Sequence, residues 1–323
     1  LEPGTFVYDE WDYQTGAYRS RWCLVKEHVL DEGDLDCFDD ALRRHSALLE
    51  EVKQQFEAIL PEGLGRITRL TDGEDLDLNA ALEALADLRM RVPPDDKIYW
   101  RRYKVRRDVA VVFLLDMSAS TAETLSIEGP GPPFPGGRGP RSAAGRSKRR
   151  IIDLEKDSIA LLMQALDAIG DAYGIYGFSG YGREGVDFYV VKDLAERLDS
   201  RIKRRLDRVT PRHATRMGAA IRHAVRRLAP HAAATKILLL LSDGRPQDRG
   251  YSRQGTSKAY AVHDTHMALT ESRAQGITPF CLTVDKAGHD YLQAMCGDIG
   301  YEVLDDIATL PARLPMLYRA LTA

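Results

Sequence analysis

The chain has 323 residues, with 45 Lys and Arg against 48 Asp and Glu, a formal net charge of -3 and 44% apolar residues. Its length allows one large domain, or one standard domain with a sizeable appendage. The nearly balanced charge argues against bulk nucleic-acid binding, and no apolar run approaches the roughly 18 residues that a membrane helix needs. We therefore expect a soluble globular protein with neither nucleic acid nor membrane insertion.

The four cysteines, Cys23, Cys37, Cys281 and Cys296, lie far apart and form no CxxC pair. This spacing indicates neither a zinc ribbon nor a dense disulfide scaffold. No secretory leader precedes the first predicted element, so the reducing cytoplasm is the expected location. Because the chain opens at Leu1 rather than at a methionine, we expect it to be a fragment whose N-terminal remainder is missing.

The first 107 residues predict an N-terminal extension. Its opening, "YDEWDYQTGAYRSRWC", has no sustained period and predicts irregular, partly extended structure. The following stretch, "ALRRHSALLEEVKQQFEAILP", carries apolar residues at helical spacing and predicts one helix that Pro61 closes.

The extension continues with a second helix, expected from Leu78 to Met90, with Asp77 as its N-cap. Four leucines at helical spacing predict an apolar stripe along it. The segment "KIYWRRYKV" then predicts an edge strand before the next domain begins.

From residue 108 to 323, short apolar runs alternate with amphipathic segments. The predicted strands cover residues 109–115, 172–178, 186–191, 236–242, 277–284 and 301–304. The predicted helices cover residues 151–169, 194–208, 216–228, 259–275, 288–296 and 308–321. This alternation is typical of a doubly wound α/β domain, with a mostly parallel sheet flanked by helices.

One segment interrupts this α/β pattern. Residues 129–147 contain 11 Gly or Pro, and residues 129–150 hold six Arg or Lys and no acid. Such a composition predicts a flexible insertion over 129–150. It is either a solvated loop or a basic flap that draws an acidic partner toward the end of the preceding strand.

Oxygen side chains gather at several predicted strand ends. The buried run in "DVAVVFLLDMSAS" leads into Asp116, Ser118 and Ser120, whose alternate spacing directs them to one side of an extended segment. Alone, this arrangement suits a nucleophile, a phosphate cradle or a metal. Thr215 precedes a predicted helix and Asp243 ends another strand, at the edge where open α/β sheets bind their ligands.

Five hard oxygen donors suit Mg²⁺, or another divalent cation such as Mn²⁺, better than zinc or copper. The hydroxyls of Ser118, Ser120 and Thr215 can coordinate directly while Asp116 and Asp243 act through waters. Most of the ion's charge then stays unneutralised, and an open position favours an Asp or Glu from a partner. This is a binding mechanism that breaks no bond.

These motifs resemble known families. "DMSAS", the Thr of "ATRMGAA" and the Asp of "LLSDG" resemble the metal-ion-dependent adhesion site of von Willebrand factor A (VWA) domains. Over nearly the whole chain, the stretches "YDEWDYQTGAYRSRWC", "TDGEDLDLNAALEALADLR", "ATRMGAAIRHA", "SDGRPQD" and "LPARLPMLYRALT" are similar to the C-terminal part of NorD and CbbO proteins. Those are nitric oxide reductase and Rubisco activation proteins. The resemblance implies a VWA fold over 108–323 and a non-enzymatic adaptor that joins a hexameric MoxR-type AAA+ ATPase to a target enzyme.

Two enzymatic alternatives stay open. A metal-dependent hydrolase or phosphatase would use Asp116 as its nucleophile, although Ser118 stands where a second Asp is expected. An acyl-transfer enzyme would pair Ser118 or Ser120 with His213 and Asp243, but no G-x-S-x-G elbow is present. No phosphate-binding loop occurs, so any ATP hydrolysis belongs to a separate partner.

Overall fold

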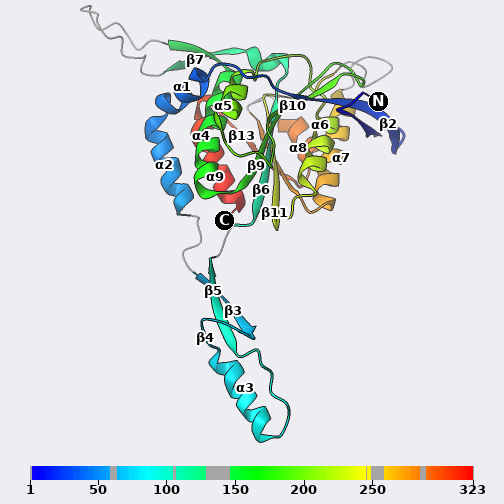
Figure 1. The fold of residues 1–323 in the computed structure, drawn as a ribbon. Helices are drawn as coiled ribbons and strands as arrows, with labels where there is room; N and C mark the ends of the chain where they lie inside the picture. The colour runs from blue at the N-terminus through cyan, green and yellow to red at the C-terminus, as the bar shows by residue number, and fades with distance from the viewer. Residues whose placement is uncertain are drawn as a thin grey trace, which may run out of the picture. The chain divides into compact units, whose positions relative to one another are not determined.

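The computed structural model divides the chain into two compact units (Figure 1). The described residues are 2–58, 64–104, 107–128, 146–244, 246–248, 258–283 and 289–322. The larger unit comprises residues 1–57 and 108–323, and the smaller one comprises residues 58–107. The structure thus divides the expected 1–107 extension differently, because its first 57 residues pack into the α/β unit.

The larger unit is built on an eight-stranded sheet in the order β1-β2-β10-β9-β6-β11-β12-β13. Its strands are β1 (Thr5–Asp12), β2 (Ala17–Val29), β6 (Val109–Asp116), β9 (Ala172–Gly180), β10 (Val186–Lys192), β11 (Thr235–Ser242), β12 (Thr278–Thr283) and β13 (Gly300–Val303). Only the β1–β2 and β9–β10 pairs are antiparallel. The mostly parallel sheet confirms the predicted doubly wound class.

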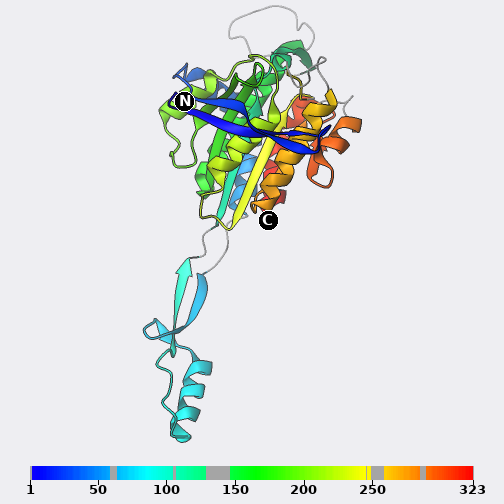
Figure 2. The same ribbon diagram turned by 90° about the vertical axis from the view of Figure 1, so that its right-hand side faces the viewer.

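Helices cover both faces of this sheet, as Figures 1 and 2 show. One layer holds α1 (Asp36–Arg44), α2 (Ser46–Glu57), α4 (Ile151–Ile169), α5 (Ser200–Asp207) and α9 (Leu310–Thr322), the last preceded by the short η2 (Ile307–Thr309). The other layer holds α6 (Met217–Leu228), α7 (Lys258–Ala274) and α8 (His289–Cys296). Because both faces are covered, all eight residues of β6 are buried, which explains its uninterrupted apolar run.

The N-terminal stretch forms regular strands rather than the expected irregular structure. Strands β1 and β2 make an antiparallel hairpin, and β2 also pairs in parallel with β10. Cys23 and Val25 alternate inward from β2 and are fully buried. The aromatic residues nearby are only partly buried, so no single apolar period runs through the segment.

Two predicted helices of the larger unit needed correction. The helix expected up to Pro61 is two helices, α1 and α2, which meet at His45; Pro61 itself lies outside the described residues. The helix expected over 194–208 begins only at Ser200, because the Asp199 side chain caps it by accepting from the Ile202 amide.

Part of the expected flexible insertion is also ordered. Strand β8 (Arg146–Arg150) pairs in antiparallel fashion with β7 (Thr124–Glu128), and α4 follows β8 directly. The prediction of flexibility over 129–150 is therefore wrong for 146–150. Residues 129–145 lie outside the described part of the chain.

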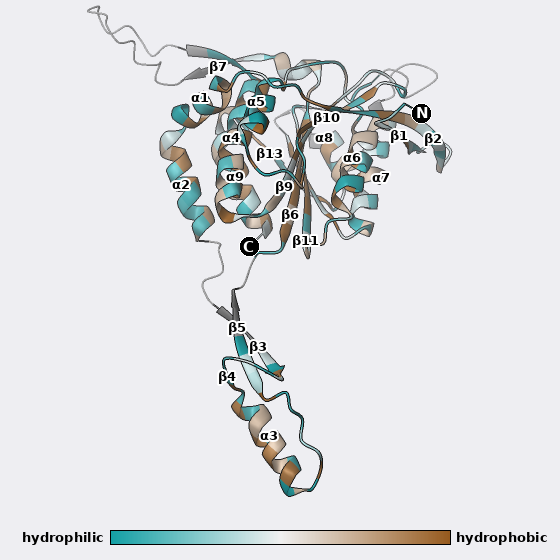
Figure 3. Cartoon of the chain, in the orientation of Figure 1, coloured by the Kyte–Doolittle hydropathy of each residue, from teal (hydrophilic) through white to brown (hydrophobic). Residues whose placement is uncertain are grey.

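The smaller unit contains a three-stranded sheet and one helix. Strand β5 (Tyr99–Lys104) lies between β3 (Leu64–Leu70) and β4 (Asp75–Leu76), so the predicted edge strand is central. Helix α3 (Leu78–Arg89) begins as predicted, with the Asp77 carboxylate accepting from the amides of Asn79 and Ala80. Its leucine stripe is exposed, and Figure 3 shows these apolar residues along the helix. In the described part of the chain, no helix is long and apolar enough to span a membrane.

Candidate functional site

The carboxyl ends of β6 and β11 bring Asp116 beside the "SDG" turn. The two strands pair in parallel, with Leu115 opposite Leu241, so Asp116 and Ser242 end their strands together. The Ser242 hydroxyl lies 2.8 Å from Asp116 Oδ2 and donates to it, while the Ser118 amide donates to Oδ1 at 2.9 Å. Asp116 is therefore held by both of its oxygens in a fixed orientation.

The two serines of "DMSAS" lie next to each other after the strand ends. Their Oγ atoms are 2.9 Å apart. Ser118 is buried and Ser120 is exposed at the start of η1 (Ala119–Ala122). The alternate spacing therefore gathers the two hydroxyls as predicted, with one of them facing solvent.

Backbone hydrogen bonds fasten the loop that carries Thr215 to both strand ends. The amide of Ala119 donates to His213 O at 2.7 Å, and the amide of Arg212 donates to Met117 O at the same distance. On the other side, the Thr215 amide donates to Gln247 O at 2.7 Å. Hydrogen bonds thus join three segments that are distant in sequence, and together these segments carry all five predicted site residues.

The electrostatics of the group favour a cation. Burial, and then the charge of Asp243, raise the pKa of Asp116 to about 7. Burial, followed by the charges of Asp243 and Asp116, also raises the pKa of Glu155 on α4 well above its usual value. Buried carboxyls that disfavour one another's ionised forms are stabilised by a positive ion among them.

The donor set fits magnesium or manganese better than zinc. Among the described residues, no three or more His, Cys, Asp or Glu side chains are grouped so that they could hold a metal. The oxygens present are instead hydroxyls from Ser118, Ser120 and Thr215 together with the carboxylates of Asp116 and Asp243. Hard cations that retain part of their water shell match such a set.

The pairing required by acyl transfer is not formed. His213 is exposed, and its ring lies edge-on to Tyr181 with the ring centroids 5.8 Å apart. Within the described residues, no hydrogen bond joins its imidazole to Ser118 or Ser120. The serines therefore lack an activating base in this arrangement.

A buried ion network lies next to the Thr215 position, and the sequence analysis did not predict it. Arg216, the residue after Thr215, is fully buried and lies 2.6 Å from Glu10 Oε2 and 2.9 Å from Asp248 Oδ2. Asp248 Oδ1 also accepts from the Gly182 amide. Arg216 thus links strand β1 to the loop after β11, directly beside Thr215.

Sequence signals existed for two of the residues that were missed. Glu155 lies four residues from both Ile151 and Ile159, on the apolar face of its helix, where a charge is unusual. Arg216 directly follows the candidate ligand Thr215. Glu10 and Asp248 gave no local signal, because their partner is distant in sequence.

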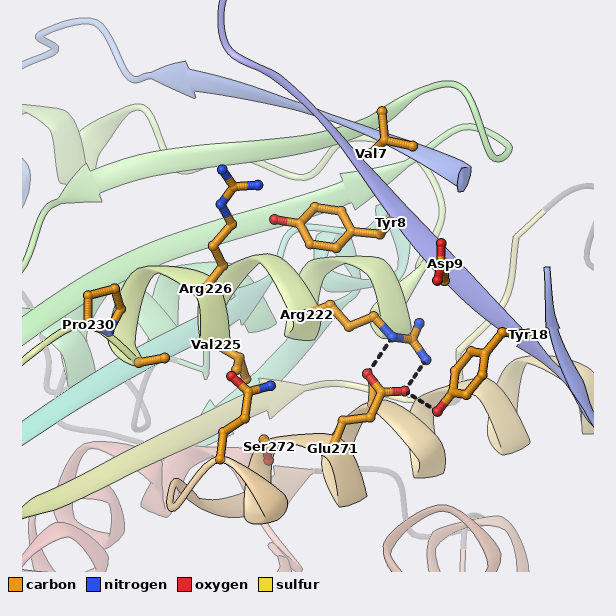
Figure 4. A pocket seen from close by; sticks show the side chains of 13 residues that line it. Val7, Tyr8, Asp9, Tyr18, Arg222, Val225, Arg226, Pro230, Glu271 and Ser272 are labelled. Atoms are coloured by element: carbon orange, nitrogen blue, oxygen red, sulfur yellow. Dashed lines mark hydrogen bonds and ion pairs between the residues drawn. The ribbon is translucent and has the colours of Figure 1, made fainter. Parts of the chain in front are cut away.

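A cavity of about 640 Å³ lies away from this group, between β1, α6 and α7 (Figure 4). Arg222 on its wall is paired at 2.8 Å with Glu271, which also accepts from the Tyr18 hydroxyl. None of the five predicted site residues lines it. Its polar contacts join the N-terminal hairpin to helices α6 and α7.

The chain matches the family model of the von Willebrand factor type A domain over residues 142–312. The matched range includes Thr215 and Asp243 and begins after the segment that carries Asp116, Ser118 and Ser120. The match therefore covers two of the three pieces of the predicted site.

Curated relatives cover almost the whole chain. It is 33% identical over 315 residues to Protein NorD of Brucella melitensis, covering 98% of this chain and 45% of that protein. It is 30% identical over 300 residues to Protein NorD of Stutzerimonas stutzeri, covering 92% of this chain and 44% of that protein. The chain thus spans less than half the length of these relatives.

Solved structures give more distant matches. The PilB minor pilin from Streptococcus sanguinis matches with a TM-score of 0.46 and 14% identity, covering 68% of this chain and 62% of the other. The vWF domain of the type V pili tip protein Mfa5 from Porphyromonas gingivalis matches with a TM-score of 0.44 and 10% identity, covering 68% and 97%.

Proposed function

The chain belongs to the von Willebrand factor type A family as a NorD-like protein, and from this membership we propose that it is a non-enzymatic adaptor. In this proposal it binds partner proteins through a divalent cation, Mg²⁺ or Mn²⁺, at a metal-ion-dependent adhesion site. The site consists of Asp116, Ser118, Ser120, Thr215 and Asp243.

One observation carries the proposal. Hydrogen bonds fix the ends of β6 and β11 and the Thr215 loop to one another, at 2.7 Å between Ala119 N and His213 O and 2.8 Å between Ser242 Oγ and Asp116 Oδ2. A site so organised pays little ordering cost when it binds a cation, which favours affinity.

The side chains suggest how a partner would be held. A bound cation supplies a positive charge that attracts an oxygen anion. The three hydroxyls offer neutral oxygens, and the buried Asp116 is already engaged by Ser118 and Ser242. Exposed Ser120 marks the open side, from which an Asp or Glu of the partner can approach. In this proposal the chain's own residues position the cation and orient the partner's acidic side chain, and they break no bond.

The resemblance to NorD and CbbO proteins supports a partner assignment. We propose that a hexameric MoxR-type AAA+ ATPase supplies the energy and that the cation site grips an acidic side chain of a target enzyme in the cytoplasm. The NorD relatives are more than twice as long as the chain. They support the proposed ATPase and target enzyme only because the chain belongs to the same family.

The test uses purified ATPase and candidate target enzyme with three forms of this protein. Wild-type protein should capture its partner with Mg²⁺, lose it with chelator and regain it when Mg²⁺ or Mn²⁺ is returned. Asp116→Ala should lose capture under all conditions. Ser200→Ala, which changes an exposed serine at the start of α5, serves as the matched control and should behave as wild type.

Capture that is unchanged by chelator and by Asp116→Ala would refute the cation mechanism. The hydrolase alternative has a separate readout. If the purified chain hydrolyses a phosphate ester such as p-nitrophenyl phosphate, and Asp116→Ala removes that activity, the protein is an enzyme.

A further inference from the structure

Glu155 is a buried acid that the five-residue site does not use. It lies in the second turn of α4, is 2% exposed, and has apolar neighbours such as Ile152 and Ile159. Its Oε2 atom is buried and accepts no hydrogen bond from any described residue. Burying a carboxylate without a partner is costly, so such a group normally has a proton or a nearby positive charge.

The neighbouring charged residues of α4 all have partners, which makes Glu155 an exception. Asp153 pairs with Arg150 at 2.8 Å, Asp157 pairs with Arg149 at 2.5 Å, and the ammonium of Lys156 donates to Asp207 O at 2.7 Å. Neighbouring elements β8 and α5 therefore supply partners for these three charged residues of α4. Within the described residues, no ion pair involves Glu155.

Glu155 lies close enough to the candidate cation site to feel the charges of its carboxyls. Helix α4 packs against η1, the turn that follows Ser118. The charges that act on the Glu155 carboxyl, after burial itself, are those of Asp243 and Asp116, and both raise its pKa. A single cation at the site would offset the negative charges of all three carboxyls, those of Glu155, Asp243 and Asp116.

We propose that Glu155 is a sixth member of the cation site and acts from the outer coordination sphere, where its carboxylate accepts a hydrogen bond from a water on the cation. This inference rests on the proposed function of the site. An outer position agrees with the geometry, because the described His, Cys, Asp and Glu side chains form no group of three that could hold a metal directly. Outer groups of this kind orient the coordinated water and tune affinity.

The position also predicts cation preference. A carboxylate that works through water requires a cation that keeps its water shell. Mg²⁺ keeps several waters at short, regular distances, whereas Ca²⁺ takes six to eight ligands in flexible geometry. Glu155 should therefore contribute more to the binding of Mg²⁺ or Mn²⁺ than to the binding of Ca²⁺.

The test measures cation binding directly, by calorimetric titration of the whole chain with MnCl₂. Glu155→Gln should weaken Mn²⁺ binding about tenfold or more, the effect expected of an outer-sphere group. Glu155→Leu, which suits the apolar surroundings, should weaken it at least as much and keeps the test valid if the Gln variant folds poorly. Asp167→Asn, an exposed acid on the same helix, is the matched control and should bind as wild type.

A second readout separates this role from a structural one. The cation-induced rise in Tm should shrink in both Glu155 variants and stay unchanged in Asp167→Asn. If folded Glu155 variants bind Mn²⁺ as tightly as wild type, the inference fails while the proposed site stands. If wild-type protein binds no Mn²⁺, both the inference and the cation site fail.

Discussion

Helices α6 and α3 have the same length and similar apolar spacing, but only one of them is buried. Each has 12 residues. In α6, Ile221, Val225 and Leu228 are at most 3% exposed, because strands from distant parts of the chain lie beneath them. In α3, Leu82 and Leu85 are 65% and 53% exposed. Apolar periodicity thus predicts a helix in both units. Whether the apolar face of that helix is buried depends on whether other elements of the fold pack against it.

The largest expected effect comes from the ion network beside α6. Arg216→Met leaves Glu10 and Asp248 buried with an uncompensated charge, which should cost about 3–5 kcal/mol of unfolding free energy. Urea unfolding measures the loss. Arg201→Ala, which removes an exposed arginine from α5, is the control and should leave the urea midpoint unchanged. Equal midpoints for Arg216→Met and wild type would contradict the structural role of the network.

A buried leucine of α6 should give the next effect. Leu228→Ala removes a fully buried side chain and should cost about 2–5 kcal/mol, depending on how far its surroundings collapse. The same urea unfolding measures it. A loss below 1 kcal/mol would mean that the face of α6 is less tightly packed than the structure shows.

A smaller, pH-dependent effect is expected at Asp157. Burial alone would raise its pKa, but hydrogen bonds from His45, Arg149 and Arg44 outweigh burial and lower the pKa below its usual value. A carboxyl with a lowered folded-state pKa stabilises the protein above its unfolded pKa, and this contribution falls as the pH drops toward the folded value. Asp157→Asn should therefore cost about 2 kcal/mol near pH 7.

The stability difference between wild type and Asp157→Asn should narrow below about pH 4, where the unfolded carboxyl takes up its proton. Thermal unfolding of both proteins from pH 7 to pH 3 measures this difference. A gap that stays constant over that range would show that Asp157 acts through packing rather than charge.

The smallest effect should come from α3. Leu82→Ser combined with Leu85→Ser changes two exposed side chains and should alter the unfolding free energy by no more than about 0.5 kcal/mol each. Urea unfolding of the isolated chain measures this. A loss comparable to that of Leu228→Ala would show that the stripe is covered in solution.

Much of the α/β unit could be predicted from sequence, because its elements depend on local pattern. The predicted boundaries of α4 are those observed, and those of β6 differ by one residue. The alternate spacing of Ser118 and Ser120 was sufficient to bring their hydroxyls together. The carboxyl ends of parallel strands lie at the same edge of a sheet. This general rule was enough to predict that Asp116 and Asp243 lie near each other.

The remaining features depend on distant partners and could not be predicted in this way. Strand β2 is stabilised by its pairing with β10, which lies more than 150 residues further along the chain, and its own sequence lacks a sustained period. Glu10 and Asp248 acquire a role only when Arg216 lies between them. Glu155 could have been noticed as a charge on an apolar face, but its neighbours could not have been identified.

The link between Arg216 and Glu10 joins residues 206 positions apart. Closing so long a loop carries an entropic cost that local contacts do not, and contacts of high sequence separation slow folding. During synthesis, β1 emerges before Arg216, and Glu10 can meet this arginine only after all the residues between them have been made. The Thr215 loop should therefore reach its final form late, and cation binding at the proposed site would report that this long-range contact has formed.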